Sequence, residues 1–247
     1  MYDRDSGGGF DVIASKGFNL IDSGPNDLTG LDGASTKGMV WVGDYSNCSW
    51  EVSDATLKSY VQAHVGDPKV GVWFISDEPD WNCPNVTQQH RDRVALIKSI
   101  DPNAKTLTVL DSNSAKASLD QLVKFKDTTD YVGLDPYVCH TNQPCVYDWI
   151  DRNAAAADAA GLNYWGVAQA FADPAVNGYQ WLDSSGTHSG SLRLPTAPEI
   201  HEQFNRWRAS QASGMLTFAW RWPRDNNLLW LQNHPELEDQ LKIENTL

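Results

Sequence analysis

The sequence predicts an α/β protein with the (β/α)8, or TIM, barrel fold, in one catalytic domain that spans residues 1–247. Short apolar stretches alternate with amphipathic helical stretches along the chain, which is the pattern of repeated parallel βαβ units. The length of 247 residues matches the about 250 residues of a typical barrel. Acidic residues follow most of the apolar stretches, where barrel enzymes carry their catalytic groups.

The apolar run at residues 70–76 is the clearest of the expected strands. It has no helical period, so it predicts a strand buried on both faces. Pro79, which cannot continue a central strand, follows soon after. The other seven strands are expected at residues 1–2 (short or truncated), 18–21, 38–42, 106–110, 131–134, 164–170 and 215–222.

The expected helices are marked by capping signals. Ser53 precedes apolar residues at the i, i+3, i+4, i+7 spacing, namely Leu57, Tyr60, Val61 and His64. Capping boxes are expected at residues 118–121 and 196–199, and glycines are expected to end helices at residues 10–16 and 147–160. The Gly/Ser-rich residues 177–192 predict a long loop that covers the substrate.

The charge balance narrows the classes of partner. The chain carries 19 Lys and Arg against 32 Asp and Glu, a net charge of -13. Phosphate groups would be repelled, so nucleic acid and anionic membranes are not expected partners. No apolar run approaches the ~18 residues that a membrane span needs. We expect a monomer that acts on a neutral or cationic substrate.

Carboxylates end five successive expected strands. They are Asp22, Asp44, the pair Asp77 and Glu78, Asp111 and Asp135, and the next strand ends at Gln169. In a closed barrel these strand ends converge on one face, so the side chains would form a ring. Acid-rich clefts either bind a metal or place two carboxylates across a glycosidic bond.

Histidine usage argues against a metal centre. Metal-dependent barrel hydrolases usually carry His at several strand ends, whereas the six His here fall in helices and loops. We therefore expect no metal ion and no cofactor, with oxygen-bound Ca²⁺ or Mg²⁺ as the alternative. Glycoside hydrolysis also accounts for Trp residues near the strand ends, because indole faces stack on sugar rings. Trp81 and Trp222 are the expected stacking platforms, and most of the 11 Trp are expected in the core.

Two motifs resemble the retaining barrel glycoside hydrolases of clan A. They are Asp77-Glu78-Pro79 after the fourth expected strand and Trp222 after the eighth. The resemblance implies that Glu78 is the general acid/base. Asp77 stands where that superfamily has Asn, and Gln169 stands where it has the nucleophilic Glu.

The second catalytic carboxylate must then come from another strand end. Asp135 is the first choice, since it ends a buried strand and Pro136 fixes its direction, and Asp111 is the second. Asp77 is expected to raise the pKa of Glu78 or to accept a hydrogen bond. Gln169 is expected to position a sugar hydroxyl or an acetamido group. The expected substrate-binding residues are Asp22, Asp44, Asp77, Trp81, Tyr137, Gln169 and Trp222.

The four cysteines predict two disulfides. Cys48 and Cys83 follow neighbouring strands, and Cys139 and Cys145 bracket a short loop. Because disulfides persist in oxidising environments, the two predicted disulfides indicate an extracellular, secreted protein. The predicted function is an endo-acting glycoside hydrolase that cleaves a polysaccharide. The alternatives are a carbohydrate-binding barrel without activity and a metal-dependent hydrolase.

Overall fold

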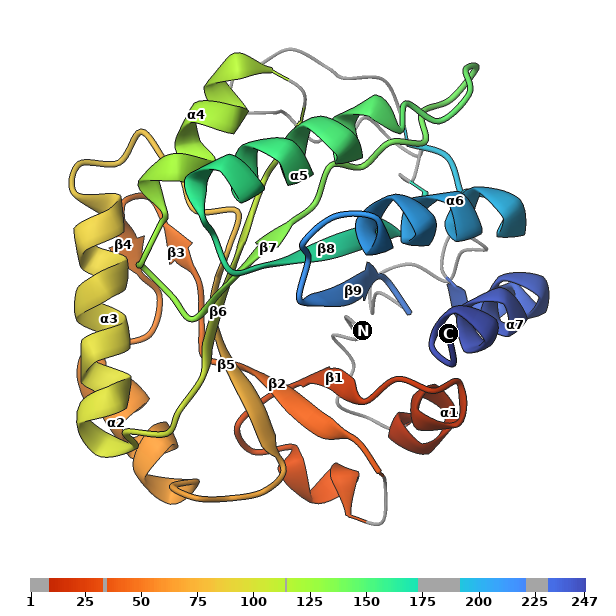
Figure 1. Cartoon of the computed structure of the whole chain (residues 1–247). Helices are drawn as coiled ribbons and strands as arrows, with labels where there is room; N and C mark the ends of the chain where they lie inside the picture. Colours follow the sequence, from red (N-terminus) through yellow and green to blue (C-terminus); the bar gives the residue numbers. More distant parts are fainter. Residues whose placement is uncertain (1–8, 33–34, 114, 173–191, 221–230) are drawn as a thin grey trace.

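The computed structural model of the protein describes residues 9–32, 35–113, 115–172, 192–220 and 231–247. One curled sheet of seven parallel strands forms the centre, and its order in space follows the chain (Figure 1). The strands are β1 (Leu20–Ser23), β2 (Lys37–Trp41), β5 (Val70–Asp77), β6 (Thr106–Leu110), β7 (Tyr131–Leu134), β8 (Tyr164–Gln169) and β9 (Gly214–Phe218). A two-stranded hairpin of β3 (Tyr45–Ser46) and β4 (Ser49–Trp50) follows β2.

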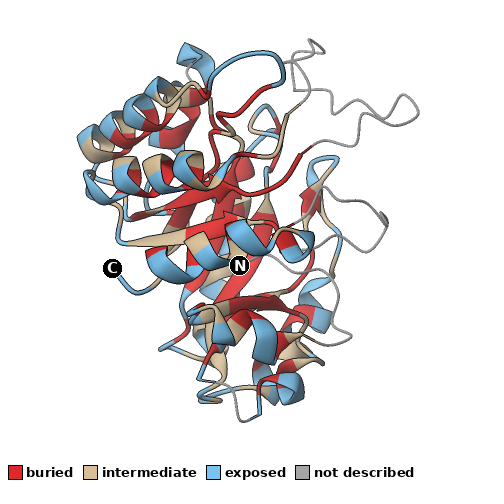
Figure 2. Cartoon of the chain, turned by 90° about the vertical axis from the view of Figure 1, so that its right-hand side faces the viewer, coloured by how far each residue is buried: buried red, intermediate tan, exposed pale blue. Residues whose placement is uncertain are grey.

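The α-helices of the described residues are α1 (Phe10–Ser15), α2 (Asp54–Ala63), α3 (Val86–Ile100), α4 (Lys116–Lys124), α5 (Asp148–Ala160), α6 (Ala197–Arg208) and α7 (Pro235–Glu244). An α-helix lies between each pair of successive strands of the sheet from β2 to β9, while α1 precedes β1 and α7 follows β9. Two short 3-10 helices, Leu28–Leu31 and Leu231–Asn233, complete the regular elements of the described residues. Figure 2 shows the strands buried at the centre, and the helices with one exposed and one buried side.

The described residues form part of the predicted barrel. Seven of the eight expected strands are present, and the expected first strand at residues 1–2 lies outside the described residues. The described chain therefore forms a seven-stranded partial barrel with β1 and β9 at the two edges of the sheet. None of its helices is long and apolar enough to cross a membrane.

Apolar residues fill both faces of the sheet, as the run at residues 70–76 predicted. Val72 and Phe74 of β5 join Leu107 and Val109 of β6 in one buried cluster. Trp73 and Ile75 belong to another cluster, with apolar residues of α2 and α3. Alternate side chains of the strand therefore fill the inside of the sheet and the layer beneath the helices.

Most of the predicted helix signals are confirmed. The Ser53 side chain accepts the Thr56 N–H at the start of α2, the Thr196–Glu199 capping box begins α6, and Gly161 ends α5 with φ +65°. The capping box at residues 118–121 was wrong, because α4 begins at Lys116 and Ser118 lies inside it. The Gln121 side chain instead donates to the carbonyl oxygen of Asp111 at 2.8 Å.

Candidate active site

Three carboxylates meet where three neighbouring strands end. Glu78 follows β5, Asp111 follows β6 and Asp135 follows β7. One carboxylate oxygen of each lies within 4.8 Å of the others. These are the three residues that the sequence predicted as catalytic, and the sheet order makes them neighbours.

The backbone at Glu78 is unusual for a residue that is not glycine. Its φ is +45°, in the left-handed region, which costs an L-residue about 1 kcal/mol. The pairing of β5 with β6 also shifts register between Phe74 and Ser76, just before this turn. Such irregularities often re-aim a side chain beside an active site.

The three carboxyl groups differ in their contact with solvent. Glu78 is exposed as a whole residue, Asp111 is half-buried, and Asp135 is only 3% exposed. The backbone N–H of Ser112 donates to Asp135 Oδ1 at 3.2 Å. Asp135 is therefore fixed by the chain that follows β6, while Glu78 can be reached from outside.

Burial and like charge raise the pKa of two of these groups. Burial, then the charge of Asp111, raises the pKa of Glu78 to about 7, and hydrogen bonding with Asp135 partly opposes the rise. Burial, then the charge of Glu78, raises the pKa of Asp135 well above its usual value. Glu78 keeps some exposed surface, so burial alone does not account for its raised pKa. The charges of the neighbouring carboxylates are the cause that the geometry supports most directly. The Glu78–Asp135 pair therefore holds a proton in the neutral pH range.

An aromatic group lies beside the carboxylates. The Tyr137 ring contacts Phe171 edge-on, with ring centroids 4.9 Å apart. Burial, followed by the charges of Asp135 and Glu78, raises the pKa of the Tyr137 hydroxyl well above its usual value. The hydroxyl therefore stays neutral, and Tyr137 remains a predicted substrate contact.

Gln169 is occupied by the protein itself, contrary to the substrate-binding role expected of it. It is fully buried, and its Oε1 accepts the Cys139 N–H at 2.8 Å. Its Nε2 donates to the carbonyl oxygens of Cys139, Phe171 and Arg193, at 3.2, 3.2 and 2.9 Å. An amide used in this way has no donor left for a sugar, so we assign Gln169 to holding the loops after β7 and β8.

The Asp44 side chain also binds backbone amides. Asp44 Oδ1 accepts the N–H groups of Asp77 at 3.0 Å and of Tyr45 at 2.7 Å. Asp22, within β1, is 6% exposed. Their contact with a substrate stays a prediction. Trp222, Asp173 and residues 177–191 of the expected loop lie outside the described residues.

The described Trp residues near the strand ends are mostly packed inside the protein. Trp220 is 5% exposed. The Arg93 guanidinium carbon lies 4.7 Å from the centroid of the Trp50 ring. The ring centroids of Trp50 and His90 are 4.8 Å apart. Trp81 is half-buried, with Lys124 Nζ 5.1 Å from its ring centroid. Trp50 and Trp81 are both half-buried, and the role of Trp81 as a sugar platform stays a prediction.

Both predicted disulfides are confirmed. Cys48–Cys83 joins the β3–β4 turn to the loop that carries Glu78, and Cys139–Cys145 closes the loop after β7. The first bond spans 35 residues.

Two contacts at the site escaped sequence reasoning. They are the Ser112 N–H that binds Asp135 and the Gln121 amide that binds the Asp111 carbonyl. The only signal for Gln121 was its presence in a Ser-x-x-Gln motif, which had been assigned to capping.

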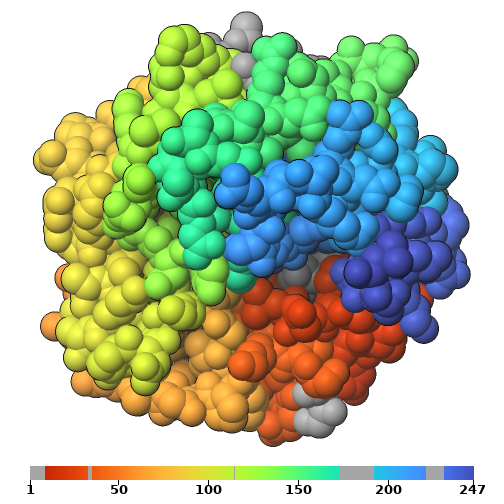
Figure 3. Space-filling model, in the orientation of Figure 1, coloured from red at the N-terminus to blue at the C-terminus, as the bar shows by residue number. Residues whose placement is uncertain are grey.

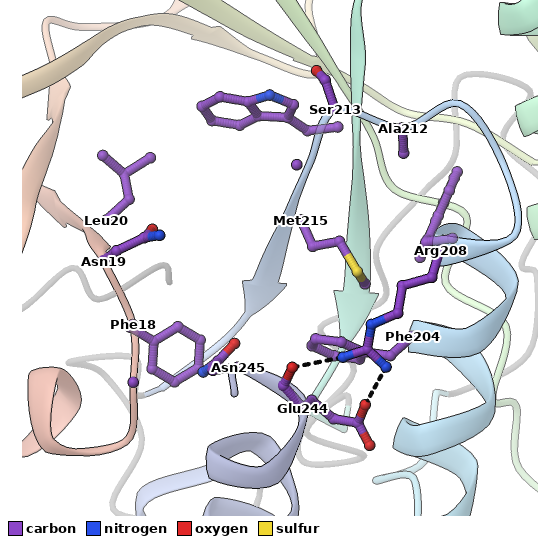
Figure 4. Close-up of a pocket in the computed structure, with 14 residues that line it drawn as sticks. Phe18, Asn19, Leu20, Phe204, Arg208, Ala212, Ser213, Met215, Glu244 and Asn245 are labelled. Carbon is purple, nitrogen blue, oxygen red and sulfur yellow. Dashed lines mark hydrogen bonds and ion pairs between the residues drawn. The ribbon is translucent and has the colours of Figure 1, made fainter. Parts of the chain in front are cut away.

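A cavity of about 470 Å³ lies at the other end of the sheet, where β1, β8 and β9 begin (Figure 4). Its lining includes Phe18, Leu20 and Met215 and the ion pair of Arg208 with Glu244. Because the strands are parallel, they all begin at one end of the sheet and finish at the other. This cavity is therefore at the end opposite the carboxylates. We do not assign it to the active site.

Within the part of the chain that the structure describes, the oxygens of the carboxylate cluster are spaced closely enough to hold a metal ion. Carboxylate oxygens are ligands for Ca²⁺ and Mg²⁺, although Ca²⁺ takes six to eight oxygens in total. The other group with suitable spacing contains Cys139 and Cys145, whose sulfurs are joined in a disulfide. The geometry of the cluster thus allows either acid/base chemistry or a divalent cation.

No protein-family profile and no curated protein sequence matches this chain. Solved structures do match it. One is a putative α-L-fucosidase from Bacteroides thetaiotaomicron, with a TM-score of 0.61 and 14% identity over 96% of this chain and 85% of that one. An endoglucanase Cel5A from Pseudomonas stutzeri matches with a TM-score of 0.61 and 12% identity over 96% and 84%. A GH2 β-galacturonidase from Eisenbergiella tayi matches with a TM-score of 0.61 and 14% identity over 96% of this chain, which spans 46% of that one. The chain therefore has a fold shared with glycoside hydrolases.

Proposed function

We propose that the protein is a glycoside hydrolase that cleaves oligosaccharides or polysaccharides by carboxylic acid/base catalysis. The observation that carries the proposal is the cluster of Glu78, Asp111 and Asp135 at the ends of three adjacent strands. Carboxyl groups at this end of a barrel-like sheet, placed in different environments, are the arrangement that glycosidic cleavage requires. The glycosidase-like fold supports the same reading.

In this proposal Glu78 is the general acid that protonates the leaving oxygen. Its pKa, raised to about 7, keeps it protonated in mildly acidic solution, and its exposure allows contact with a substrate. Asp135 is buried and has a strongly raised pKa, so we now place it as the neighbour that shares its proton with Glu78. Asp111 is half-buried and becomes the favoured second carboxylate, which reverses the order expected from sequence.

The spacing favours a retaining mechanism. Retaining enzymes place their two carboxyl groups about 5 Å apart, whereas inverting enzymes leave about 6.5–9.5 Å for a water molecule. The limit of 4.8 Å between oxygens here fits the shorter distance. Asp111 would then attack the anomeric carbon, and Glu78 would later activate the water that releases the sugar.

Hydrolysis of a polysaccharide panel by wild-type protein and by Glu78→Gln tests the proposal. Glu78→Gln should lower the rate about 10³-fold or more while glycan binding remains, because the amide cannot donate a carboxylic proton. Glu236→Gln, an exposed carboxylate of α7, is the matched control and should hydrolyse normally. Wild-type activity in Glu78→Gln would end the proposal.

The same panel separates the alternatives. Binding without release of reducing ends would indicate a carbohydrate-binding barrel, and activity that EDTA abolishes would indicate a metal-dependent hydrolase. Azide rescue of Asp111→Gly, but not of Asp135→Gly, would identify Asp111 as the nucleophile.

Three further features belong to the proposal. We propose endo cleavage, which a product mixture of mixed chain lengths would support. The two disulfides support secretion, because they persist in oxidising compartments. We also propose a monomer, which light scattering tests directly.

A further inference from the structure

The backbone that carries Glu78 is tied to the protein on both sides. On one side the Glu78 N–H donates to the carbonyl oxygen of Val109 in β6, at 2.9 Å. On the other side the Asp77 N–H donates to Asp44 Oδ1, at 3.0 Å. The amide of Asp77, the last residue of β5, therefore binds a side chain, and the amide of Glu78, which follows, binds a backbone carbonyl.

Asp44 continues the hydrogen bonding of β2 after the backbone of β2 has turned away. The Val42 N–H still donates to the Phe74 carbonyl of β5, at 3.1 Å. Gly43 follows with φ +96°, and a Cβ there would collide with the Val52 side chain. The chain turns at this glycine, and the Asp44 carboxylate takes the position that a strand carbonyl would otherwise fill.

The Asp44 carboxylate is itself held in place. The Tyr45 N–H donates to the same Oδ1 at 2.7 Å, and the Asp44 carbonyl accepts the Glu51 N–H at 2.9 Å. The Asp44 N–H donates to Glu51 Oε2 at 3.2 Å. These bonds belong to the segment that the Cys48–Cys83 disulfide links to the loop after Glu78.

We propose that Asp44 is a positioning residue, which holds the left-handed turn at Glu78 through the Asp77 amide and so aims the Glu78 carboxyl. The inference rests on the proposed role of Glu78 as the general acid. A backbone in the left-handed region persists only when its surroundings hold it, and the Asp44–Asp77 bond is one of the bonds that do so. Asp44 is thereby moved from the expected sugar-binding residues to the support of the acid.

The test compares Asp44→Ala, Asp44→Asn and the control Asp101→Ala. Asp101 is also a half-buried carboxylate that accepts a backbone N–H, that of Asn103 at 3.0 Å, but it lies between α3 and β6, away from the site. Asp44→Ala should lower kcat about 10- to 100-fold with KM changed less than about threefold, since misplacement of about 1 Å costs this much. Asp44→Asn should restore most of kcat at pH 5, because its amide oxygen still accepts the Asp77 N–H, while at higher pH the lost charge of Asp44 removes one of the causes that raise the pKa of Glu78. Asp101→Ala should behave as wild type.

Hydrogen exchange of the Asp77 amide, followed by NMR, provides a readout that needs no substrate. Exchange at Asp77 should be faster in Asp44→Ala by about tenfold or more, and near wild type in Asp44→Asn and Asp101→Ala. If Asp44→Ala does not fold, Asp44→Glu keeps the charge and displaces the acceptor, and should show the same two effects.

Wild-type kcat together with unchanged Asp77 exchange in Asp44→Ala would overturn the inference. Faster exchange with unchanged kcat would also overturn it, because the bond would then be structural alone. If wild-type protein hydrolyses no glycan, the proposed function fails, while the exchange data still decide whether Asp44 holds this turn.

Discussion

The environment gives each of the three clustered carboxyl groups a different chemical character. Glu78 reaches solvent, Asp111 is half-buried and Asp135 is enclosed. Burial and the neighbouring charges raise the pKa of Glu78 to about 7 and the pKa of Asp135 well above its usual value. This separation at a single cluster is what allows acid and base functions to operate at the same pH.

The pH dependence of hydrolysis should report the raised pKa of Glu78. A general acid works only while protonated, so kcat/KM should fall as pH rises through about 7, approaching tenfold per pH unit above that value. An unperturbed Glu would already lose its proton near pH 4.3. Initial rates between pH 4 and 9 check this, and an alkaline limb centred near pH 4.5 would contradict it.

Asp135→Asn should increase the stability of the fold at neutral pH. The folded-state pKa of Asp135 lies above its unfolded value, so ionisation opposes folding. The cost is absent below the unfolded pKa, near 4, and grows as pH rises above it. Asn keeps an acceptor for the Ser112 N–H, so the variant should gain on the order of 1–3 kcal/mol at pH 7 and little at pH 4.

Urea denaturation of both proteins at the two pH values measures this difference. Ser118→Ala, which removes a hydroxyl within α4, is a control that should show the same small change at both pH values. A destabilised Asp135→Asn at pH 7 would contradict the raised pKa.

The sequence was sufficient to predict that the three carboxylates lie together, but not how deeply each is buried. Asp111 and Asp135 directly follow predicted strands, so strand alternation was enough to place them on one edge. The direction of Glu78 depends on a register shift in β5 and on φ +45°, neither of which leaves a pattern in residue types. The burial of Asp135 depends on contacts with distant segments, which explains why its preference over Asp111 was reversed.

At the scale of elements, the hairpin β3–β4 stabilises the loop after β5 from the outside. The hairpin follows Asp44, and its turn carries Cys48, which is bonded to Cys83. The loop after Glu78 is thus fixed by a covalent bond at its far end and by the Asp44 hydrogen bond at its near end. The element that carries the acid has little freedom to move away from β6.

Removal of this disulfide should lower both stability and activity. Cys48→Ser with Cys83→Ser opens a crosslink across 35 residues, which corresponds to about 4 kcal/mol in the chain-entropy description. Thermal denaturation measures the loss, and kcat should fall because the Glu78 loop gains freedom. The comparison is Cys139→Ser with Cys145→Ser. The Cys139–Cys145 disulfide closes only a short loop, so its removal should lower the free energy of unfolding by less.

The elements also show where sequence patterns fail. Continuous apolar runs predicted the strands and glycines predicted the ends of α1 and α5, because burial and backbone freedom are local properties of residue type. Ser118 was predicted to cap a helix, but α4 begins before it, at Lys116. The Ser118 hydroxyl instead donates to Asn113 Oδ1 at 3.1 Å. Gln169 stood at a strand end like the acids, yet its amide holds two loops together. A strand-end position alone does not distinguish a ligand contact from a structural bond.

At the scale of the whole molecule, the carboxylate cluster and the cavity lie at opposite ends of the sheet. The carboxylates lie at the ends of β5, β6 and β7, while the cavity of Figure 4 lies where β1, β8 and β9 begin. Helix α7 lies beside both α1 and α6 and bridges the two edges of the sheet (Figures 1 and 3). The Asn245 side chain donates to the Lys16 carbonyl at 3.0 Å, and Glu244 binds Arg208 at 2.6 Å. The partial barrel is thus held across its edge strands by its C-terminal helix.

Glu244 should therefore matter for stability and not for catalysis. Its carboxylate is fully buried and accepts from His201, Arg208 and Gln240, at 2.7, 2.6 and 2.5 Å. Burial raises its pKa, but these hydrogen bonds outweigh burial and leave the pKa lowered. The stabilisation is present above the unfolded pKa of Glu and is lost as pH falls through the lower folded value.

Glu244→Gln should destabilise the protein by about 1–3 kcal/mol at pH 7, with a smaller loss at pH 3. Its kcat at 25 °C should equal that of wild type, because the carboxylates are at the opposite end of the strands. Asp239→Asn, a 75%-exposed carboxylate of the same helix, is the matched control and should change stability by less than about 0.5 kcal/mol. Urea denaturation at both pH values, with activity assayed on the same samples, measures both outcomes. A loss of kcat in Glu244→Gln without a loss of stability would show that the two ends of the sheet are coupled, against the separation argued here.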